Sequence, residues 1–251
     1  MTLALSLVAH RGDRARYPEN TLPAVEAAIA LGSRYLEFDV QISADGVPVL
    51  IHDATLERTA ARAGNVLEMT ARDLATVNVG EPERFPGKFA DVVISSLADV
   101  AMRLNDTPDV TVFVEAKRQS IEYHGADRVL DAIGEALSKA KFRWVLISFQ
   151  ADAVSAARRR DWRTGWVLRQ FDDTGRHWAK EMTPDYLFVS ALRLPAAPAK
   201  PWAGPWQWVV YDVNTPSLAL GLLSRGVDLL ETDDLLALAS HPDLAGGLNG
   251  P

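Results

Sequence analysis

Eight short apolar runs, rich in β-branched and aromatic residues, recur along this 251-residue chain with helical patterns between most of them. A strand followed by a helix, repeated eight times over about 250 residues, is typical of a (β/α)8 barrel, also called a TIM barrel. Thr21 and Thr215-Pro216 are helix-start residues in the intervening segments, and Gly32 and Gly226 are helix-stop residues. The predicted strands are residues 3–9, 35–40, 110–114, 144–148, 165–168, 186–189, 208–213 and 227–231.

One segment departs from this alternation. Residues 47–52 follow the Asp45-Gly46 turn with no room for a helix, so we expect a hairpin arm there and not a parallel barrel strand. The sequence after this arm has many turns and little strand pattern, which predicts a small insertion after the second strand, at about residues 53–95, with a short helix capped at Thr70. A barrel helix is expected near residues 97–104. The fold class expected from this pattern is α/β.

Composition limits the classes of function. The net charge is −7, and the only basic run is residues 158–160, so we expect no nucleic-acid partner and no anionic-membrane binding. The absence of cysteine excludes disulfides and thiolate metal sites. Residues 1–9 lack the basic region of a signal peptide, and no apolar run reaches about 18 residues. We therefore expect residues 1–251 to form one cytoplasmic TIM-barrel domain without stable membrane insertion, its oligomeric state left open.

Charged residues stand where the interior of a barrel should be apolar. Side chains alternate faces along a strand, so Glu37 and Asp39 share the inner face while their apolar neighbours meet the helices. The third run likewise places Glu115 and Lys117 inward. Three neighbouring buried carboxylates require positive charge among them. Either a divalent cation takes Glu37, Asp39 and Glu115 as oxygen ligands, or Arg11 and Lys117 neutralise the acids and no metal binds.

Two histidines are expected at the same rim of the barrel. His10 ends the first run, next to the second strand, and His52 lies on the hairpin arm that grows from that strand. Two imidazoles beside cations and carboxylates suit the cleavage of a phosphodiester, with one imidazole as base, the other as acid, and Arg11 with a metal holding the phosphate charge. The remaining histidines lack such neighbours and are expected on the surface: His124, His177 and His241.

These residues belong to a longer series of motifs. The chain resembles the glycerophosphodiester phosphodiesterase family over nearly its whole length, through the order and spacing of His10-Arg11-Gly12, Pro18-Glu19-Asn20-Thr21, Glu37-Phe38-Asp39-Val40, Asp45-Gly46-Val47-Pro48-Val49, His52-Asp53, Thr55-Leu56-Glu57-Arg58-Thr59, Glu115-Ala116-Lys117, Ile147-Ser148-Phe149, Val213-Asn214, Gly226-Val227-Asp228 and Thr232-Asp233.

The resemblance implies a TIM barrel with an insertion after the second strand. It also implies hydrolysis of small-molecule glycerophosphodiesters to an alcohol and sn-glycerol 3-phosphate, with Mg²⁺ or Ca²⁺ as the divalent cation. By motif position, the catalytic acid/base pair would be His10 and His52, the metal ligands Glu37, Asp39 and Glu115, and the phosphate-binding residues Arg11 and Lys117.

Two further positions keep more than one interpretation. By the resemblance, Glu19 lies close to the metal and to the first histidine, either as a ligand or as a residue that orients the ligands. Asn20 is expected to cap a helix that starts near Pro23. We expect packing to account for the tryptophans of the later part of the chain, and the alternative is that one of them lines the substrate site: Trp166, Trp202, Trp206 or Trp208.

The sequence departs from the family pattern at three places, and these bear on which substrates it accepts. Tyr211-Asp212 stands where the family has Trp-Thr, Ser95-Ser96 where it has Pro-Thr, and Leu230-Glu231 where it has an apolar pair. Two alternatives to the hydrolase therefore stay open. One is a lysophospholipase-D-like diesterase with an apolar approach along residues 192–194 and 202–208, and the other is a non-catalytic binder of a phosphorylated ligand.

Overall fold

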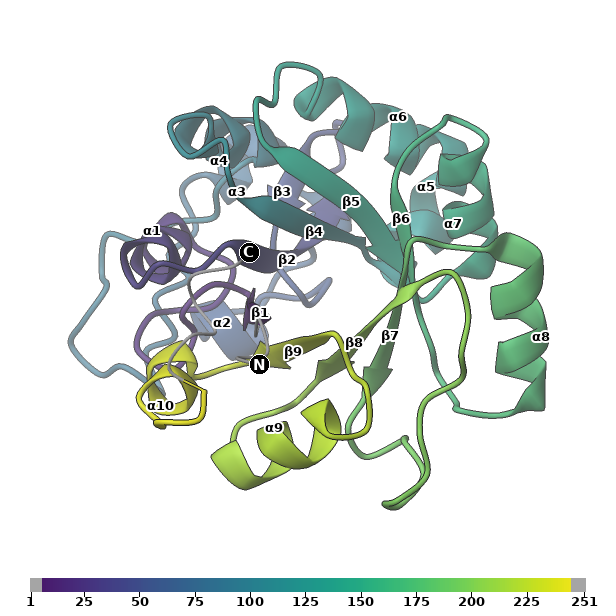
Figure 1. Ribbon diagram of the computed structural model, residues 1–251. Helices are drawn as coiled ribbons and strands as arrows, with labels where there is room; N and C mark the ends of the chain where they lie inside the picture. The colour runs from purple at the N-terminus through teal and green to yellow at the C-terminus, as the bar shows by residue number, and fades with distance from the viewer. Residues whose placement is uncertain (1–5, 245–251) are drawn as a thin grey trace.

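Eight parallel strands close into a barrel in the computed structural model, which describes residues 6–244. Each strand pairs with its neighbours in the order β1-β9-β8-β7-β6-β5-β4-β2, and the parallel pairing of β1 with β2 closes the ring (Figure 1). The (β/α)8 architecture expected from the sequence is thereby confirmed. The barrel strands are β1 (Ser6–His10), β2 (Tyr35–Ile42), β4 (Thr111–Ala116), β5 (Arg143–Ser148), β6 (Thr164–Val167), β7 (Tyr186–Ser190), β8 (Gln207–Tyr211) and β9 (Leu229–Thr232).

All eight predicted runs overlap these strands, with small shifts at their ends. The first run was expected to begin at residue 3, which lies outside the described residues, and β1 extends one residue further, through His10. Register then places the site residues: His10 pairs with Glu37, and Asp39 pairs with Glu115. The acidic positions of neighbouring strands therefore lie at the same level of the barrel.

Helices surround the strands on the outside of the barrel. The helix expected near 97–104 is confirmed as α4, where Ser96 Oγ accepts a hydrogen bond from the backbone N–H of Asp99. The first helix begins at Leu22, capped by Thr21 and not, as expected, by Asn20. The helices of the ring are α1 (Leu22–Ala30), α4 (Leu97–Leu104), α5 (Arg118–His124), α6 (Ala126–Ala136), α7 (Ala151–Arg158), α8 (Asp173–Met182), α9 (Pro216–Leu223) and α10 (Leu235–Ala239).

The core has two layers, as the strand alternation requires. Outward-facing residues of the strands pack against the helices, as Leu36, Phe38 and Val40 do on β2. The interior holds a second apolar cluster, which fills the barrel below the site: Val8, Phe113, Val145, Ile147, Val167, Tyr186, Phe188, Val209 and Leu229. Polar side chains occupy the layer above it, at the carboxyl ends of the strands.

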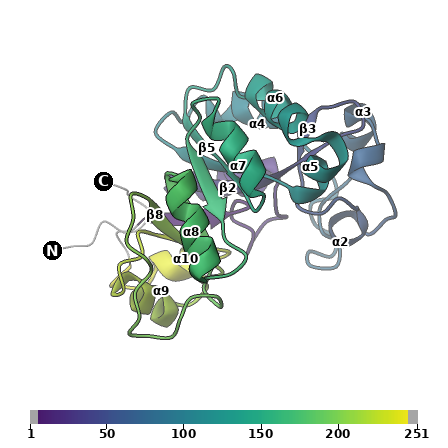
Figure 2. The same cartoon turned by 90° about the vertical axis from the view of Figure 1, so that its right-hand side faces the viewer.

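The segment between β2 and α4 forms the hairpin arm and a small substructure at one side of the barrel (Figure 2). The arm is confirmed as β3 (Pro48–Leu50), antiparallel to β2. Three short helices follow, α2 (Glu57–Ala60), η1 (Val66–Glu68) and α3 (Ala71–Leu74), and the last is capped by Thr70 as expected. The segment packs around its own apolar cluster: Val49, Ile51, Leu56, Val66, Leu74, Val77, Val79 and Ile94.

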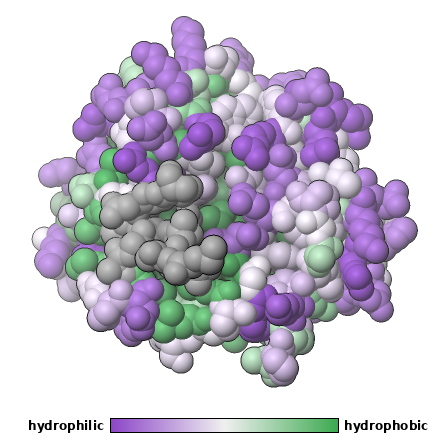
Figure 3. Space-filling model, in the orientation of Figure 1, coloured by the Kyte–Doolittle hydropathy of each residue, from purple (hydrophilic) through white to green (hydrophobic). Residues whose placement is uncertain are grey.

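The face seen in Figure 1 carries hydrophilic side chains over much of its outer part (Figure 3). None of the described helices is long and apolar enough to cross a membrane. The cytoplasmic location expected from the sequence stays a prediction.

Candidate active site

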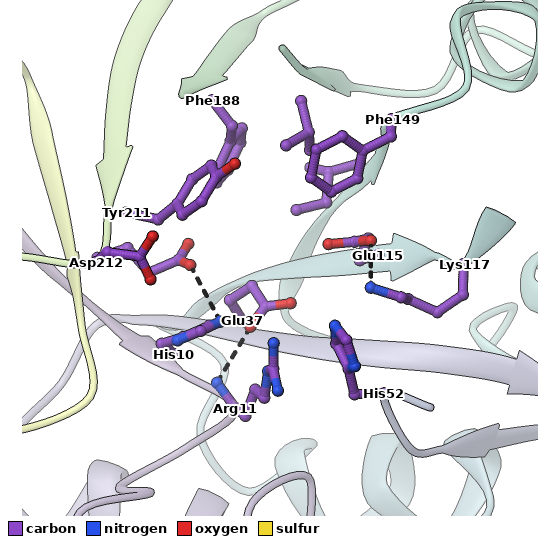
Figure 4. Close-up of a pocket in the computed structure, with 13 residues that line it drawn as sticks. His10, Arg11, Glu37, His52, Glu115, Lys117, Phe149, Phe188, Tyr211 and Asp212 are labelled. Carbon is purple, nitrogen blue, oxygen red and sulfur yellow. Dashed lines mark hydrogen bonds and ion pairs between the residues drawn. The ribbon is translucent and has the colours of Figure 1, made fainter. Parts of the chain in front are cut away.

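Inward-facing side chains at the carboxyl ends of the strands surround a cavity of about 160 Å³. Its two sides differ in chemistry, as Figure 4 shows for the labelled residues. The residues of β5, β6 and β7 form an apolar side, Ile147, Phe149, Val167 and Phe188. The polar side comes from β8, β9, β1, β2, β4 and the hairpin arm: Tyr211, Asp212, Glu231, His10, Arg11, Glu37, Glu115, Lys117 and His52.

His10 is held by a residue from the far end of the chain. Its Nδ1 lies 2.7 Å from Oδ1 of Asp233, which directly follows β9. Because a carboxylate can only accept, Nδ1 carries the proton and Nε2 is left free in the neutral ring. Burial lowers the pKa of His10, only partly offset by the hydrogen bond to Asp233. This pair fixes both the orientation and the tautomer of the imidazole.

His52 has a matching arrangement on the opposite side of Arg11 and Glu37 (Figure 4). Its Nδ1 lies 2.6 Å from Oδ1 of Asp53, and Asp53 in turn accepts a hydrogen bond of 2.6 Å from Nε of Arg58. Burial lowers the pKa of His52, outweighing the opposing effect of Asp39. Both imidazoles are therefore anchored through Nδ1 and keep Nε2 available.

Three carboxylates of the predicted metal set converge at the cavity, and Glu37 and Glu115 line it. One oxygen each of Glu37, Asp39 and Glu115 lies within 4.8 Å of the others. Burial and the neighbouring charge of Asp39 raise the pKa of Glu37 well above its usual value. Burial also raises the pKa of Glu115, although Lys117 opposes this effect. Oxygen donors crowded in this way match the coordination that hard divalent cations prefer.

Arg11 and Lys117 lie among these acids. Nζ of Lys117 is 3.0 Å from Asp39 and 2.7 Å from Glu115, and Nε of Arg11 is 2.9 Å from Asp39. Burial alone would raise the pKa of Asp39, but Lys117 and Arg11 hold it well below its usual value. Both side chains thus neutralise part of the cluster, while the donor to Glu37 from residues 6–244 is the backbone N–H of Arg11 alone, at 3.1 Å.

A tight turn after β1 directs Arg11 into the site. Gly12 has φ +80°, and a Cβ atom there would lie 2.6 Å from the carbonyl carbon of Ala24. Only glycine fits so close an approach with a positive φ. Arg11 itself has φ +56°, a conformation uncommon for residues other than glycine. The chain can therefore reverse direction directly after His10 while Arg11 stays within reach of Asp39.

Glu19 lies at the centre of a group of three arginines. Its carboxylate is 2.8 Å from Arg11, 3.0 Å from Arg14 and 2.7 Å from Arg58. Burial would raise the pKa of Glu19, but the hydrogen bond from Arg58 and the charges of Arg11 and Arg14 lower it to about 2. Through Arg58, which also contacts Asp53, Glu19 is linked to the His52 pair.

Asn20 does not cap the first helix and instead supports Asp39. Its Nδ2 donates to Oδ2 of Asp39 at 2.9 Å, and its Oδ1 accepts the backbone N–H of Asp39 at 2.9 Å. Thr21, the next residue, supplies the cap. Asn20 cannot act as the cap because its φ is +56°, a value that asparagine tolerates, whereas the backbone of a cap residue is normally extended.

Two residues of the site were not identified as such from the sequence. Asp233 appears only at the end of a motif, and its contact with His10 depends on the closure of the barrel between β1 and β9. Glu231 was noted only as a departure from an apolar pair, yet its side chain enters the cavity with Oε1 3.6 Å from Nε2 of His10. Strand alternation from Leu229 provides the signal that would have placed Glu231 inward.

The remaining candidates lie outside the site. No tryptophan is among the residues that line the central cavity, and Trp206 and Trp208 are buried in the outer core. Trp202 stacks on Phe171 with ring centroids 4.0 Å apart. His177 is exposed, and His124 and His241 are half-buried, all three outside the central cavity. His124 contacts the carbonyl of Ile42 at 3.3 Å, because it ends α5 against β2.

The fold and this site define a TIM-barrel protein with a polar centre of histidines, carboxylates and two positively charged side chains, Arg11 and Lys117. Residues 10–237 match the profile described as the glycerophosphoryl diester phosphodiesterase family, and the chain belongs to that family. It is 30% identical to human glycerophosphodiester phosphodiesterase 1 over 182 residues, 72% of this chain and 52% of that protein. It is 36% identical to a glycerophosphodiester phosphodiesterase of Caldanaerobacter subterraneus over 130 residues, 51% of this chain and 52% of that protein.

The chain thus spans about half the length of these curated relatives. Among solved structures, it is similar to an Oleispira antarctica phosphodiesterase in complex with the product sn-glycerol-3-phosphate, with a TM-score of 0.80 and 21% identity. The match covers 91% of this chain and 92% of that one, which establishes the common fold.

Proposed function

We propose that this protein hydrolyses glycerophosphodiesters to sn-glycerol 3-phosphate and an alcohol, with a divalent cation and acid-base catalysis by His10 and His52. The observation that carries this proposal is the pair of aspartate-anchored imidazoles on either side of the carboxylate cluster. Family membership and the names of the curated relatives support the class of substrate.

The donor set fits a hard divalent cation, Mg²⁺ or Ca²⁺, held by Glu37, Asp39 and Glu115. Three oxygen donors within 4.8 Å of one another, with no thiolate in the chain, satisfy the preference of these ions. When bound, such a cation stabilises negative charge that develops on phosphoryl oxygens. Burial is the main cause that raises the pKa of Glu37 and of Glu115, and the neighbouring charge of Asp39 adds to it; a bound cation would oppose both effects by favouring the ionised carboxylates.

Residues of the chain itself would bind the phosphate and transfer the protons. Arg11 and Lys117 line the cavity and would bind the phosphate oxygens. Nε2 of one histidine would take the proton of the attacking hydroxyl, while the other histidine, protonated at the start, would deliver the proton on its Nε2 to the departing alkoxide as the P–O bond breaks. The attacking hydroxyl belongs either to water or to the substrate's own glycerol, and in the second case water then opens the cyclic phosphate. Asp233 and Asp53 hold the two rings in place for these transfers. Glu19 and Arg58 would keep Asp53 and Arg11 in position.

A second candidate is a lysophospholipase-D-like diesterase that uses the same polar residues. The observation that favours it is the apolar side of the cavity, where Phe149 also lines a neighbouring cavity with Trp166, Leu168 and Trp178. Apolar side chains of this kind suit an acyl chain. Comparing turnover of glycerophosphocholine with that of lysophosphatidylcholine distinguishes the two, since the proposal expects faster turnover of the substrate without an acyl chain.

Product analysis tests the proposal. The purified protein with Mg²⁺ or Ca²⁺ is incubated with glycerophosphocholine, and sn-glycerol 3-phosphate and choline are measured by coupled assays. We expect both products in equal amounts from the wild type and a large loss in His10→Ala. Release of phosphocholine and glycerol would contradict the proposed bond cleavage. Binding of glycerophosphocholine without any turnover would indicate a non-catalytic binder.

A further inference from the structure

Glu231 is a buried acid in the site that the proposed mechanism does not use. It is 4% exposed, projects from β9 into the cavity, and its Oε2 is buried without a hydrogen-bond partner among residues 6–244. Leu229 faces the same way two residues earlier and packs in the apolar interior. Alternation would favour a further apolar residue at position 231, so a carboxylate there requires a polar partner.

Within the described part of the chain, no lysine or arginine forms an ion pair with Glu231. Arg11 pairs with Glu19 and Asp39, and Lys117 pairs with Asp39 and Glu115. The contact that Glu231 does make is with His10, at 3.6 Å between Oε1 and Nε2, which is too long for a hydrogen bond. Because leaving a buried carboxylate without donors is costly, a ligand in the cavity that carries hydrogen-bond donors would satisfy Glu231.

Glu231 and His10 together present two acceptors side by side. Nδ1 of His10 donates to Asp233, so Nε2 is an acceptor in the neutral ring. Oε1 of Glu231 lies 3.6 Å from it. Two acceptors at this separation can each receive one hydroxyl hydrogen from two neighbouring carbons. The glycerol moiety of a glycerophosphodiester carries such a pair of hydroxyls.

We propose that Glu231 accepts a hydrogen bond from the terminal hydroxyl of the glycerol moiety, while Nε2 of His10 faces the adjacent hydroxyl. This inference rests on the proposed function and names the residue that selects the free vicinal diol. The opposite side of the cavity is formed by the apolar side chains of Ile147, Val167 and Phe188, which cannot replace this contact. The glycerol end of the substrate therefore lies against β9 and β1.

A substrate pair tests this selection. Glycerophosphoethanolamine is compared with its 2-hydroxypropyl analogue, which keeps the hydroxyl near the phosphate and lacks the terminal one. We expect the wild type to prefer the glycerol substrate by roughly 10- to 100-fold in kcat/KM, the range of one hydrogen bond to a charged group. In Glu231→Leu this ratio should fall to near 1, and Glu231→Gln, which retains an acceptor oxygen, should keep part of it.

Unequal effects on the two substrates are the decisive readout. If Glu231 only supports the fold, Glu231→Leu lowers kcat/KM for both substrates by the same factor and leaves the ratio unchanged, which overturns the inference. Mn²⁺ binding by the wild type and the variant provides a second test, and equal stoichiometry is expected. One donor atom each of His10, Glu37 and Glu231 lies within 4.8 Å of the others, so these residues could also hold a metal ion. If Glu231→Leu loses one bound Mn²⁺, Glu231 is a metal ligand and the inference is overturned.

Binding without turnover separates this inference from the proposed function. Calorimetry compares sn-glycerol 3-phosphate with 2-hydroxypropyl phosphate on the Mg²⁺-loaded wild type and on Glu231→Leu. Tighter binding of the glycerol compound by the wild type alone supports the role of Glu231 even if no diester is hydrolysed. Equal affinities of the wild type for the two compounds contradict it, even if glycerophosphodiesters are turned over.

Discussion

His10 and Asp233 lie 223 positions apart in the sequence, yet Nδ1 of His10 is 2.7 Å from Oδ1 of Asp233. Closure of the barrel through the pairing of β1 with β9 brings the two residues together. Arg14 and Asn214 also contact the carboxylate, at 3.1 and 3.2 Å. Burial would raise the pKa of Asp233, but the hydrogen bond with His10 holds it well below its usual range, so Asp233 stays a carboxylate.

Asp233→Asn should lower activity by disturbing this pair. An amide can present its NH₂ group to Nδ1 and so favour the tautomer with the proton on Nε2, where a general base cannot use it. We expect kcat to fall by about 10²- to 10⁴-fold, the range for one acid or base group, with unfolding stability much less affected. Steady-state kinetics and thermal unfolding measure the two effects. Full kcat in a folded Asp233→Asn protein would show that this anchor is not needed.

The two histidines should act as one unit. His10→Ala and His52→Ala are each expected to lower kcat/KM by about 10²- to 10⁴-fold, and the double variant by much less than the product of the two losses. His124→Ala serves as the matched control, because His124 lies on α5 away from the cavity and should keep wild-type turnover. Strictly multiplicative losses, or near-normal turnover in either single variant, would count against shared acid-base catalysis.

Binding of a divalent cation should stabilise the folded protein through Glu37, Asp39 and Glu115. At a Mg²⁺ concentration 100 times the Kd, mass action contributes about 2.7 kcal/mol, which corresponds to a rise in Tm of roughly 5 to 10 °C for a chain of this size. Glu115→Gln should lose most of this rise, while Glu122→Gln, an exposed change on α5, should keep it. Calorimetry of the metal-stripped protein with added Mg²⁺ measures it. A rise unchanged in Glu115→Gln would remove Glu115 from the ligand set.

Glu19 should make stability depend on acid pH. Its pKa of about 2 in the folded protein lies below the usual value of about 4.5 for a glutamate in the unfolded chain. The stability that the ionised Glu19 contributes is therefore fully present above about pH 4.5 and is lost as the pH falls toward 2. The difference in unfolding free energy between the wild type and Glu19→Gln should therefore shrink by roughly 3 kcal/mol between about pH 5 and about pH 2. Urea unfolding at several pH values tests this, and a difference that is constant with pH would show that the carboxylate is not held ionised by the arginines.

Local patterns were sufficient to predict most of the fold and the strand-borne part of the site. The alternation around Glu37, Asp39 and Glu115 fixes which side chains face inward, and this depends only on neighbouring residues. Repeated strand and helix patterns likewise predict the barrel. The hairpin arm that carries His52 follows from the short turn before it.

Contacts between distant segments could not be predicted in the same way. The partner of His10 depends on which strands become neighbours when the barrel closes, and the group of arginines around Glu19 joins Arg11 and Arg14, from the segment after β1, to Arg58 on α2. Asn20 was assigned to the wrong role because capping residues stand at both 20 and 21, and only the backbone conformation distinguishes them. Alternation from Leu229 indicates that Glu231 faces inward, but its closeness to His10 depends on the pairing of β1 with β9.

The central claim is that the carboxylate cluster and the two anchored imidazoles hydrolyse a phosphodiester with a divalent cation. A ³¹P NMR time course of glycerophosphocholine, with the metal-stripped protein before and after addition of Mg²⁺ or Ca²⁺, tests it most directly. The account predicts conversion of the diester signal into that of sn-glycerol 3-phosphate only after the cation is added. A diester signal that stays unchanged with both cations would contradict it. A rate of hydrolysis that excess chelator does not lower would contradict it as well.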